Sequence, residues 1–303
     1  MEKQNLFSRI FQKYLSNKDI RSFKGNFFYY VFYRIIRKFI NGNIKVKICN
    51  FFINASTNKN NMSNGLLNKC YFGDERILAI IKKISDHKKT FLLDCGSNYG
   101  FYSFYVASLS ADNQVLAFEA SPKTSNAFKA NLELNNFKNI DYRNLAINEI
   151  SGKFVSFYES FNDWESSATH NNFKNNKMVT VEATTIDKEL SNKDLSNFSV
   201  IIKLDIEGNE FNAIQGGFDT IIKYEPLITI ELSKYNLNNK TYNFDYLKKF
   251  LNDTKYKIYD DKLLRVNIEN LIKEINNLDL SHQTIGNYLL FKDSSYIHRR
   301  LTN

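Results

Sequence analysis

The residues best suited to chemistry begin with a glycine-rich turn, Leu93–Gly100, in this chain of 303 residues. The turn follows an apolar run that ends in Asp94, and a helical stretch begins directly after it. Gly96 would let the backbone approach a ligand without a Cβ in the way, and N–H groups at the helix start can donate to an anion. Asn98 stands where the dinucleotide pattern G-x-G-x-x-G requires its second glycine, so a pyrophosphate site is only weakly indicated.

A further acid lies at the end of the next apolar run. Glu119 follows Gly100 by nineteen residues, and an acid at that place can accept hydrogen bonds from both hydroxyls of a ribose. The two segments together describe a nucleoside site that needs no diphosphate, which is the anatomy of S-adenosylmethionine. The other interpretation is an ordinary strand-to-helix turn followed by a surface glutamate.

Three more acids lie at the end of a third apolar run, Ser199–Asp205. Asp205, Glu207 and Glu210 fall within six positions, and Gly208 opens a turn between them. Carboxylates this close repel one another unless a cation, hydrogen-bond donors or a substrate offset their charge. In a doubly wound sheet this strand end borders the same crevice as the glycine turn. The alternative is that the two glutamates merely cap the following helix at its positive end.

Alternating strand-like and helical stretches predict the elements that position these residues. From residue 90 onward the pattern predicts an α/β fold: a doubly wound, mostly parallel sheet of Rossmann-like type covered on both faces. An antiparallel strand pair is expected near the C-terminus, and a basic helical segment at the N-terminus. The expected strands are 91–94, 115–119, 140–142, 199–205 and 226–232, with the pairs 153–158 with 178–185 and 255–259 with 287–291.

The net charge of +9 belongs entirely to the N-terminal part of the chain. Residues 1–50 contain eleven Lys and Arg against two acids, whereas the other residues contain thirty of each sign. The chain is 43% hydrophobic and 15% aromatic, which excludes global disorder. The charge therefore poses a question about one segment and not about the whole protein.

Within that segment, residues 26–41 predict an amphipathic helix, and residues 54–68 predict a loop or linker. We expect a helical N-terminal segment over residues 1–69 and a catalytic domain over 70–303. The helix could pack on the protein's own domain, lie at a membrane surface or bind nucleic acid, which is the least favoured. Its expected apolar face is Phe28, Val31, Phe32, Ile35, Ile36 and Phe39, with Arg34, Arg37 and Lys38 on or toward the opposite face.

The cysteines and the apolar runs bear on the compartment. Cys49, Cys70 and Cys95 form no C-x-x-C pair and no disulfide framework, which fits a reducing cytoplasm. No run reaches about 18 apolar residues, and the start lacks the pattern of a secretory signal. We expect a cytoplasmic protein, peripheral at the inner membrane face where the helix docks there.

Several motifs in a fixed order resemble the FkbM-type methyltransferases, S-adenosylmethionine-dependent O-methyltransferases of class I fold. The resemblance covers roughly residues 70–235. Two departures are mild: Ser97 replaces the usual alanine of a glycine-alanine-asparagine triplet, and Ala120 replaces a proline after Glu119. The motifs are LLDCGSNYGFYS (92–103), VLAFEASP (115–122) with the later Asn131, TTIDKEL (184–190), IIKLDIEGNEFNAIQGG (201–217) and PLITIEL (226–232).

The resemblance implies roles for individual residues. Glu119 would hold the ribose of S-adenosylmethionine, and Asp205 would lie near the methyl group and the acceptor, with Glu207 supporting the site. A hydroxyl acceptor needs its proton removed, for which Asp205 is the first candidate and Glu231 the second. The cofactor's amino-acid part would be surrounded by Asp94, Gly96, Ser97, Asn98 and Gly100.

Other side chains remain candidates of lower rank. His170 and His282 could serve as the base, although a lone histidine in a polar loop is more often a bystander. Trp164 could line the adenine or acceptor side, and plain packing explains it equally well. No His/Asp spacing demands a metal, so a metal requirement stays open.

The sequence thus predicts an O-methyltransferase that acts on a small-molecule or glycan hydroxyl, in particular a sugar unit of a surface glycan. The acceptor class comes from the resemblance alone. The alternative is methylation of RNA or another nitrogen acceptor, with the basic N-terminal segment binding the nucleic acid.

Overall fold

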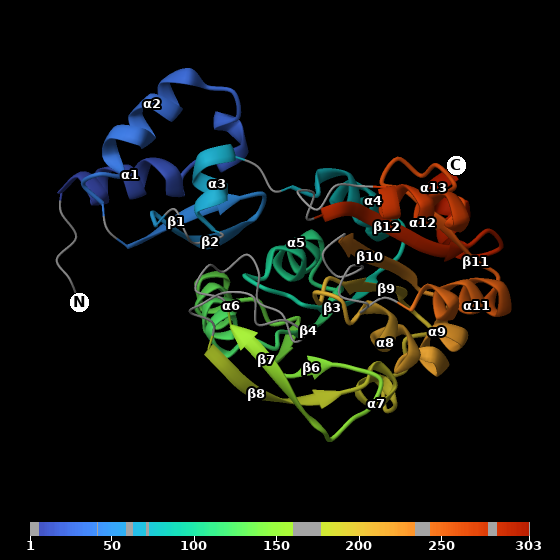
Figure 1. Cartoon of the computed structure of the whole chain (residues 1–303). Helices are drawn as coiled ribbons and strands as arrows, with labels where there is room; N and C mark the ends of the chain where they lie inside the picture. The colour runs from blue at the N-terminus through green and yellow to red at the C-terminus, as the bar shows by residue number, and fades with distance from the viewer. Residues whose placement is uncertain are drawn as a thin grey trace.

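A seven-stranded sheet forms the centre of the computed structural model, which describes residues 6–40, 42–58, 63–70, 73–159, 177–233, 243–277 and 284–302 (Figure 1). Its strand order is β11-β12-β10-β9-β3-β4-β5. The five strands from β10 to β5 are parallel, and β12 pairs antiparallel with both β10 and β11. The strands are β3 (Thr90–Cys95), β4 (Gln114–Phe118), β5 (Ile140–Arg143), β9 (Ser199–Leu204), β10 (Leu227–Ser233), β11 (Tyr256–Tyr259) and β12 (Thr284–Lys292).

Helices cover both faces of this sheet because successive strand residues point to opposite sides. Leu92 belongs to a core shared with α4 (Glu75–Ser85), α5 (Phe101–Leu109), α6 (Pro122–Asn135) and α13 (Tyr296–Thr302). Leu93 belongs to the core on the other face. The predicted doubly wound α/β class is therefore confirmed. The helices of the second face are α7 (Ile186–Leu190), α8 (Glu210–Gln215), α9 (Phe218–Tyr224), α11 (Phe244–Thr254) and α12 (Ile268–Asn277).

A smaller sheet of order β6-β8-β7 extends one side of the molecule (Figure 1). β7 (Phe154–Glu159) pairs antiparallel with β8 (Lys177–Thr184), as the sequence predicted, and β6 (Ala146–Ile147) pairs with β8. The loop expected between β7 and β8, with Trp164 and His170, lies outside the described residues.

The N-terminal segment contains more structure than the sequence predicted. Besides α1 (Leu6–Ser16), η1 (Ile20–Phe23) and α2 (Phe27–Ile36), it holds an antiparallel hairpin and α3 (Asn64–Lys69). The hairpin strands are β1 (Asn43–Ile48) and β2 (Phe51–Ser56). The loop prediction for residues 54–68 was wrong at both ends, because its first residues belong to β2 and its last residues to α3. In β2, buried side chains recur with a period of two, a pattern that the Asn-rich composition made hard to recognise.

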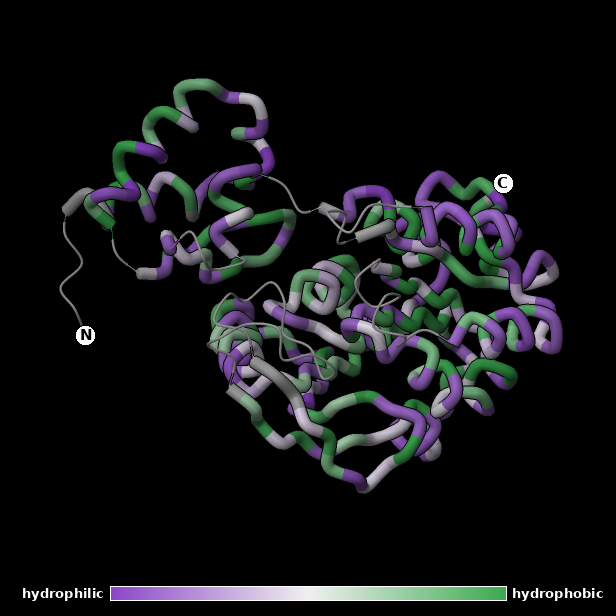
Figure 2. Tube along the Cα trace, viewed as in Figure 1, coloured by the Kyte–Doolittle hydropathy of each residue, from purple (hydrophilic) through white to green (hydrophobic). Residues whose placement is uncertain are grey.

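The buried face of α2 also differs from the prediction. Tyr29, Tyr33 and Ile36 are buried, whereas Phe28 and Phe39 are exposed. The tyrosines were not counted as apolar in the sequence pattern, yet each can bury its ring while its hydroxyl finds a partner. Figure 2 shows hydrophobic positions recurring along α2, in the part of the molecule farthest from the central sheet. Among the described helices, none is long and apolar enough to cross a membrane.

Candidate active site

Strand register places the predicted chemical side chains on one face of the sheet. Asp94 of β3 pairs in register with Lys203 of β9, and Glu231 of β10 with Asn287 of β12. Asp205 comes two residues after Lys203, so it points to the same side. This side is the one covered by α4 and α5. The carboxyl ends of β3, β9 and β10 thus bring together residues that are up to 137 positions apart in the chain.

Lys203 lies between the acidic side chains of this cluster. Its buried Nζ lies 3.2 Å from Oδ2 of Asp205 and 3.6 Å from Oδ1 of Asp94, and it donates to the carbonyl oxygen of Gly96 at 2.9 Å. Burial would lower the pKa of Lys203, but the two carboxylates raise it above its ordinary value. The side chain is therefore a fixed positive charge between the glycine turn and Asp205.

Asp205 and Glu231 form a hydrogen-bonded carboxyl pair. Burial would raise the pKa of Asp205, but the charge of Lys203 and a hydrogen bond with Glu231 lower it below its ordinary value. The negative charge of Asp205, followed by burial, raises the pKa of Glu231 well above the usual range. Glu231 therefore keeps a proton at neutral pH and donates it to ionised Asp205. The Asp205 side chain is 38% exposed, so an acceptor can reach it.

The glycine turn lies against the same strand end. Gly96 has φ +78°, and a Cβ placed there would overlap the carbonyl oxygen of Asp205. The N–H groups of Gly96 and Ser97 both donate to the carbonyl of Phe118, at 2.9 and 2.8 Å. Gly100 has φ +91°, and a Cβ there would strike the ring of Phe104. Both glycines are thus required by backbone angle and by space.

Glu119 connects the end of β4 to this turn. Its Oε2 accepts from the N–H of Asn98 at 2.9 Å, and its Oε1 accepts from the N–H of Ser121 at 2.8 Å. Burial raises its pKa to about 7 even though both hydrogen bonds oppose the shift. Each oxygen retains a further lone pair, because a carboxylate has about four acceptor positions. Glu119 can therefore accept from a ligand while it holds the turn.

The family model of the Methyltransferase FkbM domain matches residues 94–258, which is more than half of the chain. The chain belongs to this FkbM domain family. All the predicted site residues, from Asp94 to Glu231, lie inside the matched range. This confirms the family that the sequence motifs indicated.

Proteins similar to this chain include a curated relative and two solved structures. Methyltransferase 1 of Beauveria bassiana (strain ARSEF 2860) is 25% identical over 146 residues, which cover 42% of this chain and 58% of the relative. The chain thus spans less than two thirds of that relative's length. A methyltransferase FkbM structure from Methylobacillus flagellatus KT is 16% identical with TM-score 0.40, covering 67% of this chain and 44% of the other. A precorrin-6y C5,15-methyltransferase structure from Geobacter metallireducens GS-15 is 11% identical with TM-score 0.37, covering 72% and 87%.

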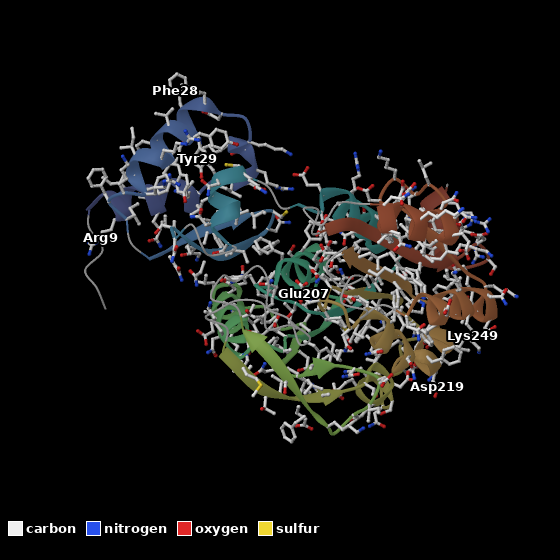
Figure 3. The ribbon with its side chains drawn as sticks, in the orientation of Figure 1. Arg9, Phe28, Tyr29, Glu207, Asp219 and Lys249 are labelled. Atoms are coloured by element: carbon white, nitrogen blue, oxygen red, sulfur yellow. The ribbon has the colours of Figure 1, made fainter. Side chains whose placement is uncertain are left out.

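The two glutamates of the FkbM domain's acidic turn have different surroundings. Glu210 is buried, and its carboxylate accepts from the N–H groups of Ile206 and Gly208 at 3.0 to 3.2 Å. Glu210 therefore stabilises the turn before α8. This role resembles the alternative interpretation of the sequence, in which the two glutamates only cap the following helix. Glu207 is half-buried with φ +55°, and its charge contributes to the raised pKa of Glu231. Figure 3 places Glu207 in the middle of the view, in the region labelled α5 and β3 in Figure 1.

Sequence reasoning missed four polar residues beside the carboxyl pair. Lys203 could have been found, because it lies two positions before Asp205 and a strand alternates with period two. The other three, Asp74, Tyr102 and Asn287, are distant from one another in sequence. Asp74, at the start of α4, accepts from Tyr102 Oη at 2.9 Å and from Asn287 Nδ2 at 2.8 Å. Burial raises the pKa of Asp74. These contacts tie α4, α5 and β12 together next to the site.

Three of the lower-ranked predictions cannot be placed. His170 and His282 lie outside the described residues, as does Trp164. Within the described part of the chain, no group of three or more His, Cys, Asp or Glu side chains is arranged to hold a metal ion.

Proposed function

We propose that this protein is an O-methyltransferase that moves a methyl group from S-adenosylmethionine to a hydroxyl acceptor. The observation that carries the proposal is the Asp205–Glu231 pair beside Lys203, at the same sheet edge as the glycine turn. S-adenosylmethionine is the cofactor of the FkbM methyltransferase family to which the chain belongs.

The residues at the turn fit this cofactor. The hydroxyl Oγ of Ser97 and Oδ1 of Asp94 are buried and have no hydrogen-bond partner among the residues that the structure describes. The missing Cβ of Gly96 keeps the backbone open beside them. We assign Asp94, Gly96, Ser97, Asn98 and Gly100 to the amino-acid part of the cofactor and Glu119 to its ribose. Oδ2 of Asp94 accepts from the hydroxyl of Ser103 at 2.6 Å, and Nζ of Lys203 lies 3.6 Å from Oδ1. The ammonium group of the cofactor would give Oδ1 a direct hydrogen bond.

The carboxyl pair supplies the proton chemistry. When bound, S-adenosylmethionine supplies a sulfonium methyl group for in-line displacement. Asp205 would accept the proton of the acceptor hydroxyl while the new oxygen–carbon bond forms and the carbon–sulfur bond breaks, which leaves a neutral thioether as the second product. Lys203 keeps Asp205 ionised for that role, and the proton on Glu231 orients it. Glu207 would support this pair from the turn.

The first experiment tests the cofactor site. By isothermal titration, the protein should bind S-adenosylmethionine and not NAD or ATP. Glu119→Ala should weaken binding at least about tenfold, because it removes hydrogen bonds to a charged group. Glu133→Ala removes an exposed acid of α6 and should leave the affinity unchanged. Equal affinities of the wild type and Glu119→Ala would contradict the assignment.

The second experiment tests the acceptor, which we take to be a sugar hydroxyl of a surface glycan or a related metabolite. The protein is incubated with methyl-labelled S-adenosylmethionine and an extract of its own source cells. Label that survives nuclease and protease and is absent with Asp205→Asn supports a glycan or small-molecule hydroxyl. Label released by ribonuclease would instead establish the alternative, methylation of RNA.

A further inference from the structure

One face of α2 exposes a row of large apolar side chains. We call this row the α2 stripe. Phe28 is 82% exposed and Phe39 60%, and Figure 3 shows Phe28 at the outer edge of the molecule. Side chains spaced three and four apart lie on one side of a helix, so Phe28, Val31, Phe32 and Ile35 form a continuous row. Phe39 follows in the turn after the helix ends at Ile36. The α2 stripe consists of Phe28, Val31, Phe32, Ile35 and Phe39.

The opposite side of α2 is already occupied by the protein itself. The hydroxyl of Tyr29 donates to the carbonyl of Leu67 at 2.9 Å, and that of Tyr33 accepts from Nδ2 of Asn64 at 2.8 Å. Both tyrosines are buried against α3. The α2 stripe is therefore additional to the face that attaches the helix, and the helix is apolar on two sides.

The charged side chains that border the α2 stripe are basic, and at the edge of this segment Arg21 pairs with Asp19 and Lys24 with Glu75. Residues 20–58 contain seven Lys and Arg and no Asp or Glu. At 100° per residue, Arg34 borders the stripe on the side away from the buried tyrosines, and Lys38 lies in the turn that follows the helix; both are exposed. The rest of the chain beyond residue 50 has equal numbers of acids and bases. A partner of this surface must accept aromatic side chains and also carry negative charge.

We propose that the α2 stripe docks the protein on an anionic lipid membrane. A lipid surface offers an apolar layer below negative headgroups, which matches phenylalanines bordered by cations. At 1.5 Å per residue, the ten residues of α2 are about 15 Å long, so the helix lies in the interface and does not span the bilayer.

Two other partners fit this surface less well. A symmetric contact with a second copy would bring Arg34 and Lys38 of both chains close together. Nucleic acid would match the cations and could stack on phenylalanine, but it offers nothing to cover the aliphatic Val31 and Ile35. Both partners remain distinguishable outcomes of the experiment below.

The test is flotation of the full chain with vesicles. Vesicles of equal parts phosphatidylglycerol and phosphatidylcholine should carry the protein, and vesicles of phosphatidylcholine alone should carry far less. The variant F28S/F39S should bind about tenfold more weakly, because two inserted rings are lost. The variant R34Q/K38Q should also lose about tenfold, and added salt should weaken the wild type.

Matched variants on the catalytic body control for surface change. F154S/L264S removes two side chains that are 71% and 62% exposed, and K249Q/K262Q removes two exposed lysines. Both should float like the wild type. Equal flotation of F28S/F39S and the wild type would overturn the proposal, as would equal binding to neutral vesicles. A dimer in sedimentation that F28S/F39S abolishes, or RNA binding that it abolishes without any vesicle binding, would also overturn it.

Discussion

At neutral pH, Asp205 and Glu231 hold one proton between them, and Lys203 determines where the charge lies. Without a cation, two carboxyl groups in contact share a proton and raise one another's pKa. Here the ammonium group 3.2 Å from Asp205 favours the charge on that residue. An ionised carboxylate with a protonated neighbour is suited to accept one proton, which is the requirement of a hydroxyl acceptor.

Replacing Lys203 with Met should raise the pKa of Asp205. An opposite charge at this range lowers a carboxyl pKa by about 1 to 3 units, so loss of the charge should return about that much. Carbon-13 NMR of the carboxyl groups measures the change. Lys292→Met removes the partner of Glu225 on the same sheet and should leave Asp205 unaffected. An unchanged titration of Asp205 in Lys203→Met would show that Lys203 does not control the pair.

Glu210 should make the stability of the protein depend on pH. Burial raises its pKa from the ordinary 4.5 to about 7, so between these values the folded protein binds more protons than the unfolded chain. The contribution of Glu210 to the free energy of unfolding is therefore present at pH 4.5 and is lost as the pH rises to about 7. The loss amounts to up to about 3 kcal/mol.

Glu210→Gln keeps an acceptor for the N–H groups of Ile206 and Gly208 but cannot titrate. Urea unfolding of both proteins from pH 4.5 to 7 measures the difference in slope. The wild type should lose more stability over this window than the variant. Parallel curves would mean that Glu210 titrates normally.

At the scale of elements, the sequence predicted the strands of the central sheet and the glycine turn, but not the N-terminal hairpin or the residues around the site. The apolar run before Asp94 and the glycines after it are local signals, and so is the acid at the end of β4. Family, fold class and cofactor are confirmed, whereas the roles of the site residues stay predictions. Asp74, Tyr102 and Asn287 could not be found, because only the packing of α4, α5 and β12 brings them together.

The close contact between the glycine turn and β9 gives a prediction at the same scale. Gly96→Ala should lower the free energy of unfolding by about 3 kcal/mol or more, because a Cβ there overlaps the backbone of Asp205. Gly152→Ala is the matched control: its φ is +80° against +78°, but its Cβ would meet open space. It should cost only about 1 kcal/mol of backbone strain. Urea unfolding that gives equal losses would show that space at Gly96 is not limiting.

At the scale of the whole molecule, the N-terminal segment is joined to the catalytic body by side chains of α6. Oδ1 of Asn131 accepts from the N–H of Asn54 in β2, and Asn135 exchanges hydrogen bonds with both backbone groups of Phe52. One hydrophobic core includes Phe11 near the N-terminus and Phe291 near the C-terminus. This core continues across residue 69. The predicted domain boundary at that residue stays a prediction.

Asn131 also reaches the glycine turn, and this connects the N-terminal segment to the cofactor site. Its Nδ2 donates to the carbonyl of Tyr99 at 3.0 Å, while its Oδ1 holds β2 at 2.8 Å. Asn131→Ala should therefore loosen both contacts: amide exchange of Asn54 should become faster, and the affinity for S-adenosylmethionine should fall about tenfold.

Asn135→Ala separates the two effects, because Asn135 bonds β2 and its own helix but not the turn. It should speed amide exchange in β2 and leave the affinity for S-adenosylmethionine unchanged. Hydrogen exchange and isothermal titration on both variants measure the two quantities. If Asn135→Ala weakened cofactor binding as much as Asn131→Ala, the N-terminal segment as a whole would support the turn. If neither variant changed the affinity, the turn would be held by its strand contacts and Glu119 alone.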